Sequence, residues 1–236
     1  MKKRLFFTVF LVFVSAFSVF SQHTQVQNQL LSDTKWLHFG FTLGMNYQDL
    51  KVKHSNAKDE AGNSYYMEVP TFRPGFTVGV ISDLKLFECL NLRFVPTLNF
   101  GDRSLIFVNE RGEKAPKSQV LKSTLLDFPL YIKYRAERHN NYRPYLIAGS
   151  GITLDLAREK GEMILLKPSD VMVEFGVGCD FYLPYFKLAP ELKLCLGMLD
   201  MLERDRGDLY IVTDKKYTKA ISKLSSRMIV LTFNFE

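Results

Sequence analysis

The chain has 236 residues, of which 47% are hydrophobic and 14% aromatic, and its formal net charge is +6. Three of the positive charges lie at positions 2–4, and no basic stripe interleaved with aromatic residues follows, so we expect no nucleic-acid partner. Three cysteines at scattered positions (Cys89, Cys179 and Cys195) exclude a disulfide framework and match no zinc-site spacing.

The N-terminus has the pattern of a secretory signal peptide. Basic residues 2–4 precede an apolar run over residues 5–20, and Val19 and Ser21 occupy the −3 and −1 positions of a cleavage site before Gln22. We predict a signal peptide over residues 1–21 and a periplasmic tail over residues 22–35. The alternative is an uncleaved membrane anchor, but the apolar run is short for a span, and no cysteine follows the cleavage site to carry a lipid.

The rest of the chain alternates between apolar and polar residues with a period of two, the pattern of strands with two different faces. The first four such runs cover residues 37–48, 75–85, 90–100 and 123–134. Their apolar positions are Phe39, Phe41, Leu43, Met45 and Tyr47, then Phe76, Val78, Val80 and Leu84, then Leu90, Leu92, Phe94, Leu98 and Phe100, and finally Leu126, Phe128, Leu130, Ile132 and Tyr134.

Four more runs follow, over residues 142–156, 171–181, 188–198 and 227–235. Eight strands are therefore predicted, and no apolar run of 18 residues suggests a helical span after residue 21. Of the 14 glycines, ten share the polar face of these strands, at positions 40, 44, 75, 79, 101, 149, 151, 176, 178 and 197.

The predicted connections alternate in length along the chain. Long connections fall at about 50–73, 109–119, 158–168 and 200–224, and short ones at about 86–89, 136–141 and 183–185. This alternation is typical of an up-and-down membrane barrel, whose periplasmic turns are tight and whose outer loops are longer. An even strand number then places both termini on the periplasmic side.

A soluble β-barrel with an apolar core is the alternative to a membrane barrel. The interior of an eight-stranded barrel is barely wide enough for side chains, which favours glycine and small polar residues on the inner face. The apolar face is then the outer one and faces lipid. We therefore predict an all-β, eight-stranded antiparallel transmembrane barrel over residues 36–236, located in the outer membrane.

Aromatic and proline residues add two further expectations. Aromatic residues flank the short turns where a membrane interface would hold them. Pro96, Pro129 and Pro190 lie inside predicted strands, where each removes a hydrogen-bond donor and favours a bulge or a strand end. The interface residues are Trp36, Tyr131, Tyr134, Tyr142, Tyr145, Phe181, Tyr182, Tyr185 and Phe186.

Ten charged residues fall on the predicted inner face and admit two interpretations. In the first interpretation they form a catalytic cluster. In the second they pair with one another and fill the barrel, and we favour the second because unpaired buried charges are costly. No nucleophile–histidine or histidine–aspartate spacing involves the four histidines (His23, His38, His54 and His139), so we predict no catalytic, cofactor or metal site and no small-molecule substrate. The inward charges are Asp83, Asp127, Asp155, Glu174, Asp180 and Glu191, with Lys85, Arg93, Lys133 and Lys193.

Five stretches resemble the PorT family of outer-membrane proteins from Bacteroidetes, which belongs to the type IX secretion and gliding machinery. They are FRPGFTVGVISDLKL from Phe72, LNLRFVPTLNFGDRSL from Leu90, LLDFPLYIKYRAERHNNYRPYLIAGSGI from Leu125, FGVGCDFYLPYFKLAPELKLCLGM from Phe175, and the terminal LSSRMIVLTFNFE. The resemblance implies a non-enzymatic role in exporting cargo that carries a C-terminal secretion signal. The departure is Glu236, because strands of such barrels commonly finish on an aromatic residue, which here is Phe235.

Three functions are thus open. The resemblance favours a component of the type IX machinery, whose partners are the outer-membrane lipid bilayer and other secretion components. The second hypothesis is a stand-alone structural or adhesion barrel that binds external ligands through its loops. A barrel enzyme that processes lipids or peptides is the third.

Overall fold

The computed structural model describes residues 26–54, 65–68, 73–109, 114–157, 165–203 and 221–236. The predicted signal peptide falls on positions outside these ranges. A short 3-10 helix, η1 (Ser32–Thr34), precedes ten strands that make one antiparallel sheet. The strands are β1 (Leu37–His54), β2 (Tyr65–Glu68), β3 (Pro74–Lys85), β4 (Leu90–Phe94), β5 (Thr97–Asn109), β6 (Lys114–Arg135), β7 (Tyr142–Asp155), β8 (Ser169–Tyr182), β9 (Lys187–Gly197) and β10 (Ile221–Phe235).

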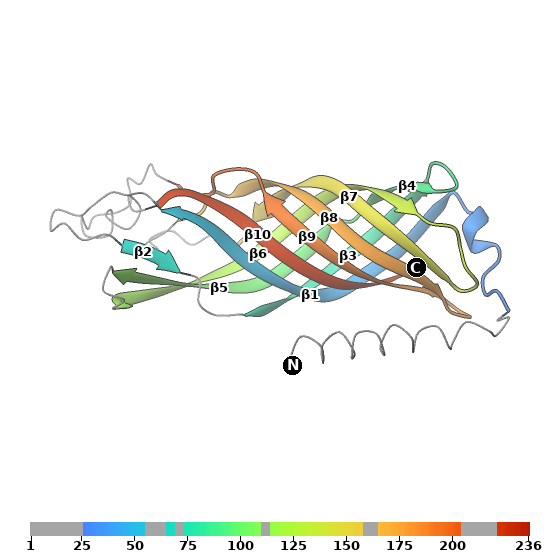
Figure 1. Cartoon of the computed structure of the whole chain (residues 1–236), viewed down its shortest axis with the longest axis horizontal. Helices are drawn as coiled ribbons and strands as arrows, with labels where there is room; N and C mark the ends of the chain where they lie inside the picture. The colour runs from blue at the N-terminus through green and yellow to red at the C-terminus, as the bar shows by residue number, and fades with distance from the viewer. Residues whose placement is uncertain (1–25, 55–64, 69–72, 110–113, 158–164, 204–220) are drawn as a thin grey trace, which may run out of the picture.

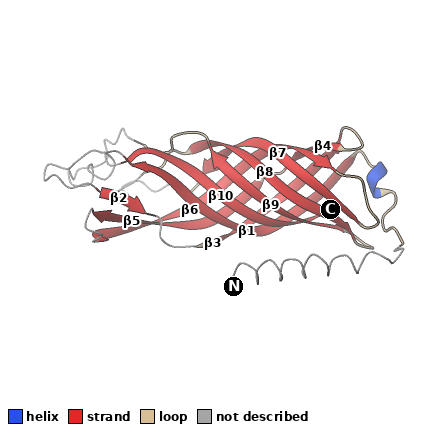
Figure 2. Cartoon of the chain, in the orientation of Figure 1, coloured by secondary structure: helices blue, strands red, loops and turns tan. Residues whose placement is uncertain are grey.

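The sheet closes on itself as a barrel (Figures 1 and 2). β1 pairs with β10 on one side, where Phe41 lies opposite Phe235, and with β3 on the other, where the same Phe41 lies opposite Val80. β4 and β5 follow one another along the same path between β3 and β6, so they count as one interrupted strand of the barrel wall. The wall therefore has eight strands, as predicted, and β2 is an addition outside it.

The interruption between β4 and β5 coincides with two prolines. Phe94 pairs with Leu130 and Thr97 with Asp127, a constant register on either side of a gap that contains both Pro96 and Pro129. The two missing donors thus share a single break in the ladder. The expectation of a strand end is confirmed at Pro96, whereas at Pro129 it is wrong, because β6 runs through that residue and its carbonyl accepts a hydrogen bond from the Val95 amide (3.3 Å).

Pro190 also stays inside its strand. Its register against β10 is unbroken, with Pro190 opposite Phe233. On the β8 side, the assigned pairs pass from Gly178 with Glu191 to Phe181 with Leu188 without a change of register. The predicted bulge is therefore absent at this position, and the proline costs only a local loss of pairing.

The first described residues, the C-terminal end of β10 and the short connections lie at one end of the barrel (Figure 1). The strand bounds leave positions 86–89, 136–141 and 183–186 for the turns at this end, which by the rule for outer-membrane barrels faces the periplasm. We call it the periplasmic end and its opposite the outer end. Three of the four predicted long connections are long. The one predicted at 109–119 is not, because β5 extends to Asn109 and β6 begins at Lys114.

The two strands β5 and β6 therefore project beyond the rest of the wall, and β2 pairs with the projecting part of β5 (Figure 1). β10 likewise starts six residues before the alternation predicted, at Ile221. Outside the bilayer, both faces of a strand meet water, so the apolar–polar alternation that marks a membrane strand is not required there.

The faces of the wall have the predicted polarity. Phe41 is 51% exposed whereas its neighbour Thr42 is 1% exposed, and the same contrast separates Ile132 (53%) from Lys133 (0%). Large apolar side chains cover the outside, and polar side chains lie within. Of the residues described, none belongs to a helix long and apolar enough to cross a membrane.

Candidate functional site

The lumen holds most of the charged side chains that alternation assigns to the inner face. Buried among them are five acids and three bases, while Lys85 and Asp155, close to the ends of their strands, are only partly buried. The buried set is Asp83, Asp127, Glu174, Asp180, Glu191, Arg93, Lys133 and Lys193.

Arg93 on β4 is the centre of the largest ion-pair group. Its Nε lies 2.8 Å from Asp83 Oδ2, Nη1 lies 3.3 Å from Glu191 Oε2, and Nη2 lies 2.6 Å from Glu236 Oε1. Glu236 also contacts Lys187. One guanidinium thus ties together strands β3, β4 and β9 and the end of the chain, because each of its three nitrogens donates to a different carboxylate.

Glu236 was noted in the sequence only as a departure from the usual aromatic finish, and the structure explains it. Because Phe235 faces outward, the next side chain points into the barrel. There the Glu236 carboxylate is 2% exposed and neutralises Arg93 and Lys187. Extending the alternation by one residue would have found this lumen acid.

A second ion pair lies beside the first. Lys133 Nζ is 2.9 Å from both carboxylate oxygens of Asp180 and 4.0 Å from Asp83 Oδ2. The same ammonium lies 3.9 Å from the ring centroid of Tyr145, whose hydroxyl donates to Glu191 at 2.7 Å. The aromatic ring therefore adds a cation–π contact to the two carboxylates around this ammonium.

Further toward the outer end, a third group centres on Glu174. The Tyr131 hydroxyl donates to its carboxylate at 2.6 Å, and the Cys195 thiol at 3.3 Å. Lys193 Nζ lies 3.3 Å from the Tyr131 oxygen and 3.7 Å from Glu191, which connects this group to the Arg93 group. The Arg93, Lys133 and Glu174 groups are thus connected, as the pairing interpretation predicts. Asp127 lies outside this network, and its carboxylate accepts a hydrogen bond from the Asn99 side chain.

The placement of three predicted interface tyrosines is wrong. Tyr131 and Tyr145 lie in the lumen, 1% and 3% exposed, because both have the inward parity of Lys133 and Arg143. Tyr182 is also buried, at the periplasmic end. The other predicted interface residues are exposed on the outside, namely Trp36, Tyr134, Tyr142, Phe181, Tyr185 and Phe186.

Apolar side chains also fill the lumen, which the sequence analysis did not anticipate. One buried cluster, from strands β6, β8, β9 and β10, consists of Leu125, Met172, Cys195, Met228 and Val230. Another gathers Ile81, Val95, Tyr131, Tyr145, Ile147 and Ala189. Apart from Val95, which lies between β4 and β5, these residues occupy inward positions of their strands, so the interior combines charge pairs with clusters of buried apolar groups.

The periplasmic mouth is occupied by the segment before β1. Asp33 of η1 receives three arginines, with closest distances of 3.1 Å to Arg143, 3.2 Å to Arg138 and 3.6 Å to Arg135. The Tyr182 hydroxyl donates to the same carboxylate at 2.8 Å. Burial acts to raise the pKa of Asp33, but the hydroxyl and the three guanidinium groups outweigh it, so this pKa lies below its ordinary value of 3.8.

Polar side chains hold the rest of this segment to the turns. The Asn28 side chain donates to the Tyr182 carbonyl (3.0 Å), and the Gln29 side chain donates to the Leu183 carbonyl (2.7 Å). The Asn141 side chain in turn accepts from the Asn28 amide at 2.8 Å. Residues 26–36 are therefore a docked element that we call the N-terminal latch.

The outer end carries a second closure. Leu166 and Leu202, from the β7–β8 and β9–β10 connections, form an isolated β-bridge, and both are buried. The Met201 amide donates to the Leu224 carbonyl at 2.8 Å, which joins the same connection to β10. The charged residues of the last connection, at 204–219, lie outside the described residues.

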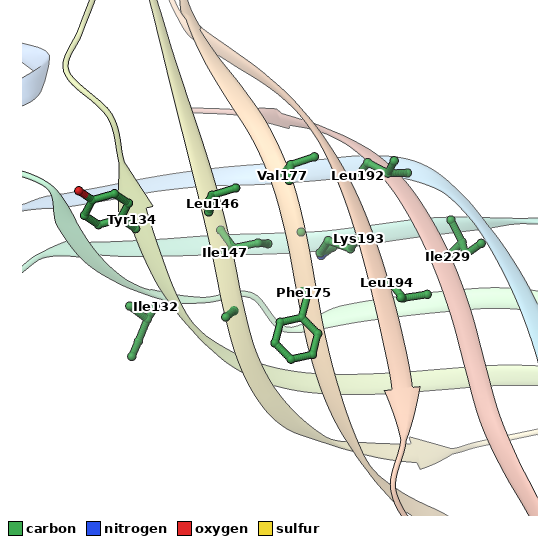
Figure 3. A pocket seen from close by; sticks show the side chains of 12 residues that line it. Ile132, Tyr134, Leu146, Ile147, Phe175, Val177, Leu192, Lys193, Leu194 and Ile229 are labelled. Atoms are coloured by element: carbon green, nitrogen blue, oxygen red, sulfur yellow. The ribbon is translucent and has the colours of Figure 1, made fainter.

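A hollow of about 690 Å³ lies on the outward wall where Ala148 of β7 stands between two larger neighbours, Ile132 and Phe175 (Figure 3). Its lining is almost entirely apolar. The charged residue at its edge, Lys193, is turned toward Tyr131 in the lumen. The hollow therefore belongs to the lipid-facing surface and offers no group for acid–base chemistry.

The described parts of the chain bring no three metal-ligating side chains together. His38 bonds through Nε2 to the Ser32 carbonyl (2.8 Å), and the His139 ring is tilted against the Tyr142 ring with centroids 5.2 Å apart. The His54 side chain and all of His23 lie outside the description. In the lumen, Arg93 and Lys133 are engaged with carboxylates on other strands, which fixes those strands to one another.

Known proteins provide an independent comparison. The search of curated proteins found no match. Among solved structures, Neisserial surface protein A (NspA) superposes with a TM-score of 0.43 and 9% identity over 85% of this chain and 98% of that one. Ail, the attachment invasion locus protein of Yersinia pestis, solved with the heparin analogue sucrose octasulfate, gives 0.38 and 8% over 84% and 96%.

The sequence itself matches, over residues 20–203, the family described as an outer membrane protein beta-barrel domain. That range reaches from before β1 to beyond β9. The chain belongs to this family of outer-membrane β-barrels.

Proposed function

We propose that this barrel is a non-enzymatic component of the type IX protein secretion machinery that works through its end surfaces and not through its lumen. The observation that carries the second part is the filled interior. Ion pairs centred on Arg93, the apolar cluster around Met172, and the docked latch occupy successive levels of the barrel. Because the described residues fill the lumen and form no catalytic set, we expect partners to meet the end surfaces of the barrel.

The absence of a conduction path is directly measurable. Reconstituted in planar bilayers, the full chain should show no stable single-channel steps of porin size, because an eight-stranded barrel leaves an interior that side chains fill. Regular steps would show that the packed lumen opens in a membrane, and the proposal that only surfaces act would fail.

The secretion role is supported by the sequence resemblance to the PorT family. Its test is a deletion strain, in which cargo precursors should accumulate in the periplasm with their C-terminal signals uncleaved. Complementation with the wild-type chain should restore export. A variant that replaces the β9–β10 connection by a short turn should assemble normally, as judged by heat-modifiable migration in electrophoresis. Its export of cargo in the deletion strain then shows whether this loop is needed for secretion.

An adhesion barrel is the second candidate, and the joined outer connections favour it. The Leu166–Leu202 bridge and the buried Met201 give the outer end an organised structure that could present a ligand-binding face. If the deletion strain exports cargo normally and loses only attachment to surfaces or matrix components, this candidate replaces the secretion role.

A further inference from the structure

A groove of about 540 Å³ opens at the periplasmic end, between the N-terminal latch with the start of β1 on one side and the β8–β9 turn on the other. Its lining is of two kinds. Lys35 and Ser32 contribute polar groups, while Leu37, Phe39 and Tyr185 contribute apolar and aromatic surface. An amphipathic groove of this kind at the edge of a membrane wall suits a molecule with a polar head and an apolar body.

The apolar side of the groove continues into the lipid-facing surface. Phe39 is 67% exposed and leads to Phe41, whose ring stacks on Phe235 with centroids 4.9 Å apart. Phe186, from the β8–β9 turn, lies 5.9 Å from the same Phe235 ring. Tyr185 is 95% exposed beside this aromatic patch, at the level where tyrosine and tryptophan anchor barrels to the membrane interface.

The polar side of the groove carries one uncompensated positive charge. Lys35 is exposed and forms no ion pair with any residue that the structure describes. Glu236, which also lines the groove, cannot neutralise it, because its carboxylate is held by Arg93 at 2.6 Å and by Lys187. A negatively charged group placed in the groove would meet Lys35 without displacing an existing partner.

We infer that this groove binds an anionic phospholipid of the periplasmic leaflet, with the phosphate at Lys35 and an acyl chain along Phe39 and the stacked rings of Phe41 and Phe235. Lysine near a membrane surface attracts anionic lipid. The aromatic patch can in addition contact an acyl chain, which a lipid has and a free phosphate does not. The inference rests on the membrane location of the barrel and is independent of any role in secretion.

Trp36 provides a built-in reporter, because it is the only tryptophan of the chain and adjoins Lys35. The full chain is reconstituted in phosphatidylcholine vesicles that contain a small equal fraction of either brominated phosphatidylglycerol or brominated phosphatidylcholine. Brominated phosphatidylglycerol should quench Trp36 at a lower mole fraction. The expected preference is about fivefold at low salt, the factor that one lysine near an anionic surface contributes, and it should fall with added salt.

Matched variants separate the groove from general attraction to the membrane. Lys35→Gln should abolish the preference, whereas Lys51→Gln, which removes an exposed lysine near the outer end of β1, should keep it. Soluble glycerol phosphate should not relieve the quenching. Equal quenching by the two lipids in the wild type, a preference that survives Lys35→Gln, or displacement by glycerol phosphate would each overturn the inference, provided that every variant retains heat-modifiable migration.

Discussion

Replacement of Arg93 by methionine tests whether the charges of the lumen hold the barrel together. The side chain is 1% exposed and contacts three carboxylates at 2.6–3.3 Å. Removing one partner from a buried ionic group costs about 3–5 kcal/mol, because it leaves charge that is neither solvated nor paired.

The surroundings of Arg93 place the expected cost toward the lower end of that range. Each carboxylate would keep at least one other partner: Asp83 keeps Asn91, Glu236 keeps Lys187, and Glu191 keeps the Tyr145 hydroxyl at 2.7 Å. We therefore expect Arg93→Met to lower the free energy of unfolding by about 3 kcal/mol. Urea titration of the barrel in lipid vesicles, followed by heat-modifiable migration, measures this change.

Two further variants sharpen the test. Arg227→Met removes a guanidinium that also binds one aspartate but is 49% exposed, so it should cost less than about 1 kcal/mol. The double variant Arg93→Met with Asp83→Asn should be more stable than Arg93→Met alone, because it leaves one buried charge fewer. The reasoning is refuted if Arg93→Met costs no more than Arg227→Met, or if the second change brings no recovery.

Three other predictions follow from the polarity of the wall and from the latch. Val173→Arg places a charge on the lipid face and should lower the free energy of unfolding by roughly 2–4 kcal/mol. Glu174→Gln, at the adjacent inward position, keeps an acceptor for the Tyr131 hydroxyl and should be less destabilising. Folding titrations that gave the reverse order would contradict the assigned faces. Gly178→Val should destabilise the barrel by at least about 1–3 kcal/mol, because an added Cβ would lie 2.4 Å from Cζ of Tyr145 on the neighbouring strand. An unchanged free energy of unfolding in urea titrations would contradict that contact. Asp33→Asn should release the latch at neutral pH and shift Trp36 fluorescence. In the wild type the latch should stay docked at neutral pH and be released only as the pH falls below 3.8, because the lowered pKa of Asp33 stabilises the docked state above that value. Release of the wild-type latch near pH 6 would show that another group controls docking.

Strand positions and faces could be read from the sequence because the membrane imposes them residue by residue. In the run Phe175, Gly176, Val177 and Gly178, each alternate side chain must meet lipid or fit a narrow lumen, so the pattern is fixed by solvent and by space. The same parity places Tyr131 and Tyr145 inside. Aromatic residues near turns are common at the membrane interface, which is why the sequence suggests that place for these two tyrosines. Their position in the apolar–polar alternation is the stricter constraint, and it directs both side chains into the lumen.

The contacts of the latch could not be read in this way. Asp33 contacts arginines more than 100 positions away, and no periodic pattern in the eleven residues of the latch selects a turn as its binding site. The projecting parts of β5 and β6 escaped prediction for a related reason. Beyond the bilayer neither face is required to be apolar, so pairing between the strands continues without leaving a signature in the sequence.

The division of labour within the wall follows from which side is apolar. In a soluble barrel the hydrophobic core supplies most of the stability, but here the apolar side chains face lipid both in the folded state and in any inserted intermediate. What distinguishes the folded barrel is the closed ladder of backbone hydrogen bonds together with the lumen contacts around Arg93, Lys133 and Glu174. Substitutions in the lumen should therefore act chiefly on stability, whereas substitutions at the outer connections and around the N-terminal latch should act on partners while leaving the barrel folded.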